Sequence, residues 1–538
     1  MPAVDDLCRS YLDLKYHFDP AAASSAGLVS HDARLGSFDP DSVREHLAGL
    51  RAISAAVEEL EADDLQSEID RTALLGEIRS AIFRLEHERP NLRNPAFWLS
   101  HVFQGLYAIL ARHDAAAGGR APAALERLQG VPRFLDTGRA TLREPPPVFV
   151  DSALGMLGGG GELIVQLAAT LSGEAPGLRP ELQAATGEAL EALKRFGTAL
   201  RDEIEPADDP QSFAIGEEQF SRRLHHEHAL AAGAPELWRY GLHLVEETET
   251  ELAVAAGRIN GRPWRQLVDE LRNDAPSPDA VLGAYRAELD RAHAFVADRD
   301  LVSIPSDPVQ VVATPAFLAS LVPFAAYEPP PIFLGDQTGR FYVTRPAPGT
   351  SGEALRRQLR GHCVHAIPAM VAHEAYPGHH LQLTTAQGLG SEVRRHLWTP
   401  VMVEGWALYS EQLMEEAGFY RDAESRIFQL VNLLWRAARI VLDVGLHTRG
   451  MTPAEAVDYM TEHLPIERAG AEAEVRRYCA WPTYQLCYAV GRRELLRLRE
   501  AYRERAGSAF APKRFHDELL AYGGLPVALA RWGMELAE

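Results

Sequence analysis

Residues 371–383 read VAHEAYPGHHLQL and place three histidines and a glutamate within a short stretch. His373 and Glu374 begin as the zinc-binding sequence H-E-x-x-H does, but a proline stands where that sequence has its second histidine. Histidines follow instead at His379 and His380. Imidazole nitrogens and carboxylate oxygens are ligands that zinc favours. The segment therefore predicts a zinc site whose helix carries an insertion.

The spacing of these histidines decides which of them can share an ion. On an unbroken helix His373 and His380 would lie roughly 10 Å apart along the axis, too far for one zinc. Pro377 cannot donate the helical hydrogen bond, and Gly378 permits backbone angles outside the helix. Three residues looped out would return His380 to the i, i+4 relation with His373, so we expect His380 as the second ligand. His379 would need a different bulge, and the choice between the two stays open.

The sequence VEGWALYSEQL supplies the remaining candidates on a second predicted helix. Glu404 is the expected third zinc ligand. Glu411 lies two turns further on the same face, where it would orient a ligand histidine through the other ring nitrogen. Glu374 is the expected general base, which takes a proton from zinc-activated water and passes it to the leaving amine.

These side chains must be positioned by helices, because apolar residues recur three and four apart along most of the chain. The run LGGGGELI, residues 157–164, interrupts this pattern and predicts a bend. The ranges with a helical pattern are 41–88, 124–142, 181–205, 235–259, 278–300, 403–418, 425–450, 452–464 and 484–507.

One segment has a different pattern. Residues 329–346 contain two β-rich runs, IFL at 332–334 and RFYVT at 340–344, separated by turn residues GDQTG. They predict a hairpin whose second strand, including Tyr342, has an exposed edge. Such an edge can pair with the backbone of an extended peptide.

The composition limits the classes of function. The chain has 538 residues, 46% of them hydrophobic, which is typical of a globular protein. A net charge of −21 argues against nucleic acid or an anionic membrane as the main partner. Four cysteines without a C-x-x-C pair indicate a reducing compartment. The first twenty residues do not read as a signal peptide, and we find no uninterrupted apolar run long enough to span a membrane. We therefore expect a cytoplasmic protein.

The quoted motifs carry a family resemblance. HEAYPGHHLQ, EGWALYSE, RIVLDVGLHTRGMTPAEA and YQLCYAVGRREL resemble the bacterial family called domain of unknown function 885. That family is similar to gluzincin zinc peptidases such as angiotensin-converting enzyme, neurolysin and carboxypeptidase Taq. The resemblance implies a mainly α fold, a two-lobed helical shell around a deep channel with a small sheet near the active site. It also implies an N-terminal lobe of about residues 1–300, a catalytic lobe of about 301–538, and hydrolysis of short peptides.

The resemblance also implies donors for the oxyanion of amide hydrolysis, which related peptidases take from Tyr or His on C-terminal helices. The best positions in this sequence are His447, Tyr484 and Tyr488, together with whichever of His379 and His380 does not bind zinc. Arg492 would bind a carboxylate of the substrate.

Other readings of the sequence are a metal-dependent amide hydrolase of a non-peptide substrate and an inactive binding protein. A helical di-metal enzyme is disfavoured, because none of the 20 histidines has a glutamate three residues before it. Two further clusters have poor spacing for a shared ion, since neighbouring positions on a helix point apart. They are His225, His226 and His228, and His362, Cys363 and His365.

Overall fold

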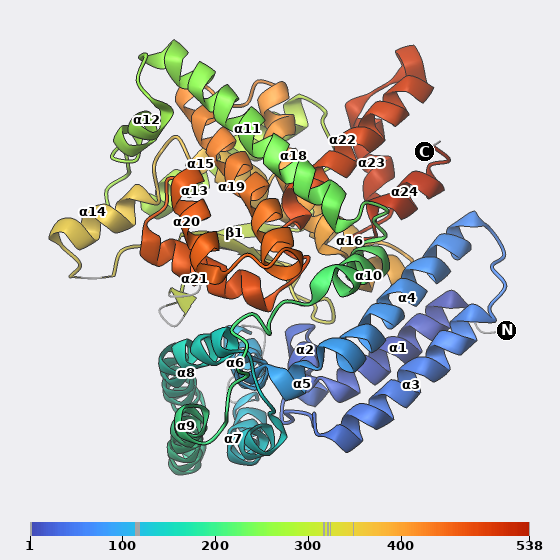
Figure 1. Cartoon of the computed structure of the whole chain (residues 1–538), viewed down its shortest axis with the longest axis vertical. Helices are drawn as coiled ribbons and strands as arrows, with labels where there is room; N and C mark the ends of the chain where they lie inside the picture. The colour runs from blue at the N-terminus through green and yellow to red at the C-terminus, as the bar shows by residue number, and fades with distance from the viewer. Residues whose placement is uncertain are drawn as a thin grey trace. The chain divides into compact units, whose positions relative to one another are not determined.

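Helices form most of the chain, and the strands form one small sheet (Figure 1). This computed structural model describes residues 3–112, 119–315, 318–319, 322, 324–347 and 349–536. The mainly α fold predicted from the apolar periodicity is confirmed.

The chain divides into two compact units. The first contains residues 1–61, 74–214 and 331–337, and the second contains residues 62–73, 215–330 and 338–538. The main division thus falls near residue 215, whereas the family resemblance implied lobes of about residues 1–300 and 301–538. The candidate site belongs entirely to the second unit.

The described residues of the first unit form helices and the loops between them, and no strand. In it α6 packs against α8, and α7 packs against α9. Its helices are α1 (Val4–Phe18), α2 (Pro20–Ser25), α3 (Pro40–Glu58), the later part of α4 (Leu65–Phe83), α5 (Pro90–Arg93), α6 (Pro95–Ala111), α7 (Ala121–Thr141), α8 (Pro147–Glu174) and α9 (Arg179–Asp202).

The predicted bend at residues 157–164 is wrong, because α8 runs through all four glycines without interruption. Gly160 packs directly under the ring of Phe103 of α6, where a Cβ would lie 1.9 Å from that ring. A glycine that lets two helices approach stays in the helix despite its low propensity. Among the described residues α8 alone is long and apolar enough to cross a membrane by length and composition, and this is weak evidence of such a role.

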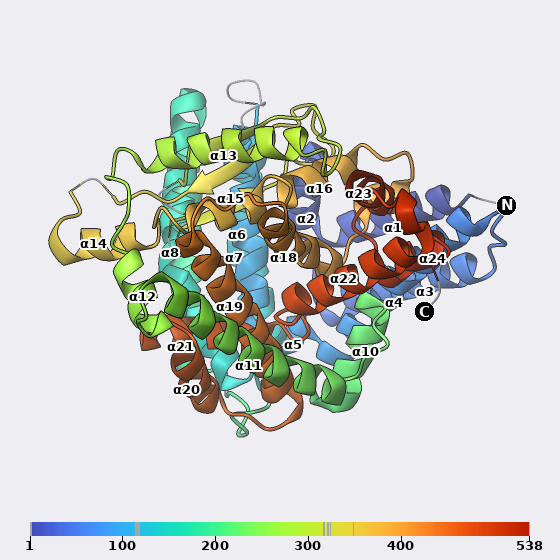
Figure 2. The ribbon, with the colours of Figure 1, turned by 90° about the horizontal axis from the view of Figure 1, so that it is seen from above.

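The second unit contains the remaining helices. In both ribbon views α11 and α19 lie side by side, and α18 lies along α22 (Figures 1 and 2). The helices are α10 (Gly216–His228), α11 (Ala234–Ile259), α12 (Trp264–Leu271), α13 (Val281–Asp298), α14 (Gly352–Arg360), α15 (Ile367–Glu374), α16 (His379–Gln387), α17 (Glu392–His396), α18 (Pro400–Glu416), α19 (Ala423–Thr448), α20 (Pro453–His463), α21 (Arg468–Ala480), α22 (Cys487–Ala506), α23 (Pro512–Leu520) and α24 (Val527–Gly533).

The sheet has the strand order β1-β3-β2, with β1 (Val309–Ala313) parallel and β2 (Ala325–Glu328) antiparallel to β3 (Gly339–Val343). The predicted hairpin is wrong in its first arm, because residues 332–334 form no strand and the antiparallel partner lies further upstream. The predicted exposed edge is wrong as well. β3 is the central strand, and Tyr342 is buried within it.

Candidate metal centre

The helix that carries His373 breaks just beyond it, as the proline and glycine predict. α15 ends at Glu374, and α16 begins at His379. Gly378 is required in the break, because a Cβ at that position would lie 1.8 Å from the carbonyl oxygen of His373. The rings of His373 and His379 are consequently only 4.9 Å apart between centroids.

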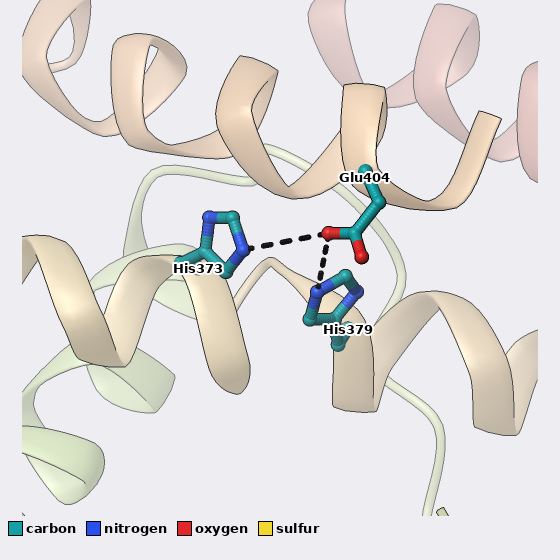
Figure 3. Close-up of side chains that lie close together, drawn as sticks. All are labelled: His373, His379 and Glu404. Atoms are coloured by element: carbon teal, nitrogen blue, oxygen red, sulfur yellow. Dashed lines mark ion pairs between the residues drawn. The ribbon is translucent and has the colours of Figure 1, made fainter. Parts of the chain in front are cut away.

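Three side chains converge at this break. The Nε2 atom of His379 lies 3.4 Å from Oε2 of Glu404, and Nε2 of His373 lies 3.9 Å from the same oxygen. Figure 3 shows both rings directed at this carboxylate, with one histidine at the end of α15, the other at the start of α16, and Glu404 on α18. One possible ligand atom from each residue lies within 4.8 Å of the other two.

His380 does not join this cluster, which corrects the predicted second ligand. Its Nδ1 lies 3.0 Å from the hydroxyl of Tyr327, and its Nε2 lies 3.0 Å from the carbonyl oxygen of Asp307. Both ring nitrogens therefore face away from Glu404. The break between α15 and α16 places His379, the first histidine of the pair, beside His373. Of the two candidates that the sequence left open, the geometry therefore favours His379.

Glu404 reaches the cluster because two helices approach unusually closely beside it. A Cβ on Gly405 of α18 would lie 2.5 Å from the Cα atom of Gly491 of α22. The next residue, Trp406, donates an indole hydrogen bond of 2.8 Å to the carbonyl of Pro377. The three consecutive residues of E-G-W thus supply the carboxylate, the close helix contact and an anchor for the break.

The hydroxyl of Tyr484 donates a hydrogen bond of 2.7 Å to the other oxygen of Glu404, Oε1. Tyr484 stands in a loop before α22 that Asp443 holds, because the two carboxylate oxygens accept the backbone N–H groups of Thr483 and Leu486. Tyr484 was predicted as an oxyanion donor, but its hydroxyl is occupied by the carboxylate. It positions Glu404 instead.

Glu411 lies behind His373, where a carboxylate that orients a ligand histidine is expected. Its Oε1 accepts a hydrogen bond of 2.9 Å from Nδ1 of His373, and its Oε2 accepts one of 3.1 Å from Asn432. Because a carboxylate only accepts, the proton of the neutral ring lies on Nδ1 and the lone pair lies on Nε2. That lone pair faces Glu404.

The electrostatics favour opposite charges on His379 and Glu404. Their side chains are only 12% and 13% exposed. Burial works against the charged form of each group, but their mutual contact outweighs it. The pKa of Glu404 falls to about 2, because of the hydrogen bond and the charge of His379. The pKa of His379 rises above its ordinary value, because Glu404 and then Glu374 favour the imidazolium.

Glu374 is held by the sheet. Its Oε2 accepts a hydrogen bond of 2.9 Å from the backbone N–H of Tyr327, on the edge strand β2. Among the described residues no hydrogen bond to Oε1 is formed, so that oxygen can accept a proton. The edge strand β2 is thus the strand beside the candidate base.

Tyr488 lies against the cluster from α22. Its ring centroid is 6.4 Å from that of His373 with the two planes 19° apart. In the described part of the chain its hydroxyl makes no hydrogen bond, in contrast to that of Tyr484. Burial and the charge of Glu404 raise the pKa of Tyr488, so the phenol keeps its proton.

The remaining predicted residues lie away from the cluster. His447 is buried and its Nε2 bonds to the carbonyl of Tyr478, which corrects its assignment as an oxyanion donor. Arg492 donates to Gln412 at 2.7 Å, between α22 and α18, which corrects its assignment as a carboxylate binder. Tyr342 is buried in the central strand. No described contact joins these residues to the three converging side chains.

The donor set fits a zinc ion. Two ligands that lie 2.0–2.1 Å from one tetrahedral zinc are about 3.3 Å apart, close to the 3.4 Å between His379 and Glu404. The 3.9 Å separation of His373 and Glu404 would have to shorten, and all three ligand atoms already lie within 4.8 Å of one another. Two imidazoles and one carboxylate are a set used by catalytic zinc sites, which keep the fourth position for water or substrate.

Comparison with known proteins places the chain in a family. The model of the family described as "Bacterial protein of unknown function (DUF885)" matches residues 20–534. The chain belongs to this family. No curated protein matches it.

Two solved structures share the fold of this family member. One is described as "a putative lipoprotein of unknown function" from Shewanella oneidensis, with 22% identity, a TM-score of 0.81, and coverage of 99% of this chain and 100% of that one. The other is "the putative lipoprotein" from Colwellia psychrerythraea, with 19% identity, a TM-score of 0.86, and coverage of 99% of each chain. At these identities the likeness shows the fold alone.

Sequence reasoning missed three residues that hold the cluster. Tyr327 and Asn432 lie outside the quoted motifs, and Asp443 lies within one of them but was not singled out. Only the fold brings these residues to the site. A signal was available for Gly405 and Gly491. A glycine inside each of two amphipathic helices indicates a close backbone approach.

Proposed function

We propose that this protein is a zinc-dependent hydrolase of amide bonds in short peptides. The observation that carries the proposal is the convergence of His373, His379 and Glu404 beside the carboxylate of Glu374. The resemblance to gluzincin peptidases supports the same activity, because those enzymes also place a glutamate next to the first ligand histidine.

His373 and His379, each through Nε2, and Glu404 would hold the ion. Zinc bound there supplies Lewis-acid chemistry, since it makes water acidic near neutral pH and polarises a carbonyl group. Glu411 keeps the proton of His373 on Nδ1, so that Nε2 offers its lone pair. Tyr484 keeps one oxygen of Glu404 turned away from the two histidines.

Glu374 moves the protons of the reaction. With Oε2 held by the N–H of Tyr327, Oε1 takes a proton from the attacking water. The C–N bond of the substrate then breaks, and the same carboxyl group gives that proton to the leaving nitrogen. The products are a carboxylic acid and an amine, and Glu374 returns to its starting state.

Tyr488 is the donor best placed to stabilise the negative charge on the carbonyl oxygen of the substrate. Its hydroxyl has no partner among the described residues, its ring lies beside His373, and its raised pKa keeps the proton on the oxygen. A donor aimed at a developing oxyanion contributes about 10²–10³ in kcat.

The test is hydrolysis of a library of dipeptides and tripeptides, free or blocked at each end, by protein loaded with zinc. We expect cleavage that a chelator removes and added zinc restores, and that is absent from Glu374→Gln. The matched control is Glu415→Gln on the outer part of α18, which should behave as the wild type does. Cleavage by Glu374→Gln at the wild-type rate, or no cleavage of any peptide by zinc-loaded protein, would overturn the proposal.

A further inference from the structure

One face of α19 points three polar side chains at the metal centre and its surroundings. Asn432, Arg436 and Arg439 follow one another at intervals of four and three residues, which places them in one row along the helix. Asn432 donates to Glu411, the carboxylate behind His373. Arg436 stands one turn further along the same row.

The surroundings of Arg436 place its charge beside the site. Its guanidinium carbon lies 5.6 Å from the ring centroid of Tyr488, and the same ring lies 6.4 Å from that of His373. The ring of Tyr488 thus neighbours both the guanidinium and the candidate zinc ligand His373.

Among the described residues Arg436 has no ion-pair or hydrogen-bond partner, in contrast to Arg439 in the same row. Arg439 lies 3.3 Å from the carboxylate of Glu474 and donates to the hydroxyl of Tyr478. No described carboxylate lies within ion-pair distance of Arg436, and its Nε is buried without a hydrogen-bond partner. A buried donor left unpaired carries a free-energy cost. A ligand that supplies the acceptor would remove that cost.

We propose that Arg436 binds a carboxylate of the substrate, and so makes the site selective for peptides that carry a negative charge close to the cleaved bond. The planar guanidinium matches a carboxylate through two parallel hydrogen bonds. At about 3.3–3.6 Å per extended residue, the ring distances place that carboxylate within about three residues of the bond. This inference rests on the proposed hydrolase activity.

A carboxylate at that position has two sources, the C-terminal end of a peptide and an acidic side chain. The site recognises the same chemistry in both. The experiment therefore needs one peptide pair that differs only in the end group and another that differs only in the side chain. It also needs a binding measurement, so that the assignment of Arg436 can be judged separately from the reaction.

The experiment is calorimetric titration of zinc-loaded, full-length Glu374→Gln protein, in which the peptides are not consumed. One pair is N-acetyl-trialanine as the free acid and as the amide. The other is N-acetyl-Ala-Glu-Ala-amide and its Gln counterpart. In Glu374→Gln protein with Arg436 intact, we expect the charged member of at least one pair to bind about 10- to 100-fold more tightly than the neutral member. The pair that shows the difference identifies the source of the carboxylate.

The variants decide whether Arg436 is responsible. Arg436→Met should remove the difference, while Arg449→Met, at the end of the same helix and stacked on Trp238, should keep it. Arg436→Lys keeps the charge and should retain part of the difference, which makes it the second variant if Arg436→Met does not fold. Equal binding of charged and neutral peptides by Glu374→Gln with Arg436 intact would overturn the inference. So would an undiminished difference in Arg436→Met or, if that variant does not fold, an undiminished difference in Arg436→Lys.

Hydrolysis of the same peptides by protein with Glu374 intact separates the two proposals. Cleavage of charged and neutral peptides at equal rates would leave the hydrolase proposal standing and contradict the role of Arg436. A charge preference in binding, without cleavage of any peptide, would support Arg436 and contradict the hydrolase.

Discussion

The hydroxyl of Tyr327 and Nδ1 of His380 lie 3.0 Å apart, and this contact ties α16 to the edge strand β2. The other ring nitrogen of His380 faces the carbonyl of Asp307, which can only accept, so the proton lies on Nε2 and Nδ1 accepts from Tyr327. Burial lowers the pKa of His380 to about 4, which keeps the ring neutral. Since the N–H of Tyr327 holds Glu374, His380 supports the candidate base from behind.

This arrangement predicts different losses for the two adjacent histidines. His379→Ala should reduce the affinity for zinc by more than the 10- to 100-fold typical of residues that only orient a ligand. His380→Ala should still bind one zinc per chain but lose about 1–3 kcal/mol of folding free energy, because the groups of Tyr327 and Asp307 lose their buried partner. Chelator competition measures the affinity, and urea unfolding measures the stability. Loss of zinc from His380→Ala alone would reverse the assignment.

Substitution of the candidate base, Glu374, should slow peptide hydrolysis without weakening zinc binding. Glu374→Gln should bind zinc as the wild type does, because the residue is outside the converging set and the amide oxygen can still accept from Tyr327. The rate of peptide hydrolysis should fall by about 10²–10⁴. Elemental analysis and single-turnover kinetics check the two quantities. A variant that loses both zinc and activity would place Glu374 among the ligands instead.

The two tyrosines of YQLCY predict opposite effects. Tyr488→Phe removes a hydroxyl that no described group uses, so it should lower kcat by about 10²–10³ and leave zinc affinity and KM nearly unchanged. Tyr484→Phe removes the hydrogen bond to Glu404 and should weaken zinc binding by about 10- to 100-fold. If Tyr488→Phe weakens zinc binding and Tyr484→Phe does not, the two roles are exchanged.

The carboxylate of Glu411 is predicted to act through His373. Glu411→Gln should weaken zinc binding by about 10- to 100-fold, because an amide in place of the carboxylate holds the Nδ1 proton less strongly. Asn432→Leu removes only the hydrogen bond to the other carboxylate oxygen of Glu411, Oε2. It should therefore weaken zinc binding less than Glu411→Gln does. Chelator competition measures the zinc affinity of both variants and shows which loss is larger. A larger loss for Asn432→Leu would contradict this order.

The local sequence predicted the parts of the site that depend on helix chemistry. The break between His373 and His379 follows from a proline and a glycine, and the place of Glu404 and Glu411 on one helix follows from its apolar pattern. Whether His379 or His380 faces Glu404 depends on how many residues the break consumes. A rotation of about 100° per helical residue separates the two side chains, and helical spacing alone does not specify that phase.

Contacts between distant segments of the chain could not be predicted from the sequence. Arg492 and Arg436 stand on amphipathic helices, and only packing decides that Arg492 meets Gln412 while Arg436 lies over Tyr488. β2 was missed for the same reason. A four-residue strand with no strong β pattern becomes an edge by pairing with β3. In α8 the glycines predicted a bend, but close packing of one of them outweighed low propensity.

The close approach of α18 and α22 predicts that the smallest change beside Glu404 is harmful. Gly405→Ala puts a methyl group 2.5 Å from the Cα atom of Gly491, so the helices must separate and carry Glu404 with them. We expect a loss of about 1–3 kcal/mol of folding free energy, together with weaker zinc binding. Gly155→Ala, in the interior of α8 with no atom within 4 Å of the new methyl, should instead stabilise the protein by about 0.5–1 kcal/mol. Urea unfolding of both variants measures the contrast, and equal stability of the two would show that α18 and α22 tolerate separation.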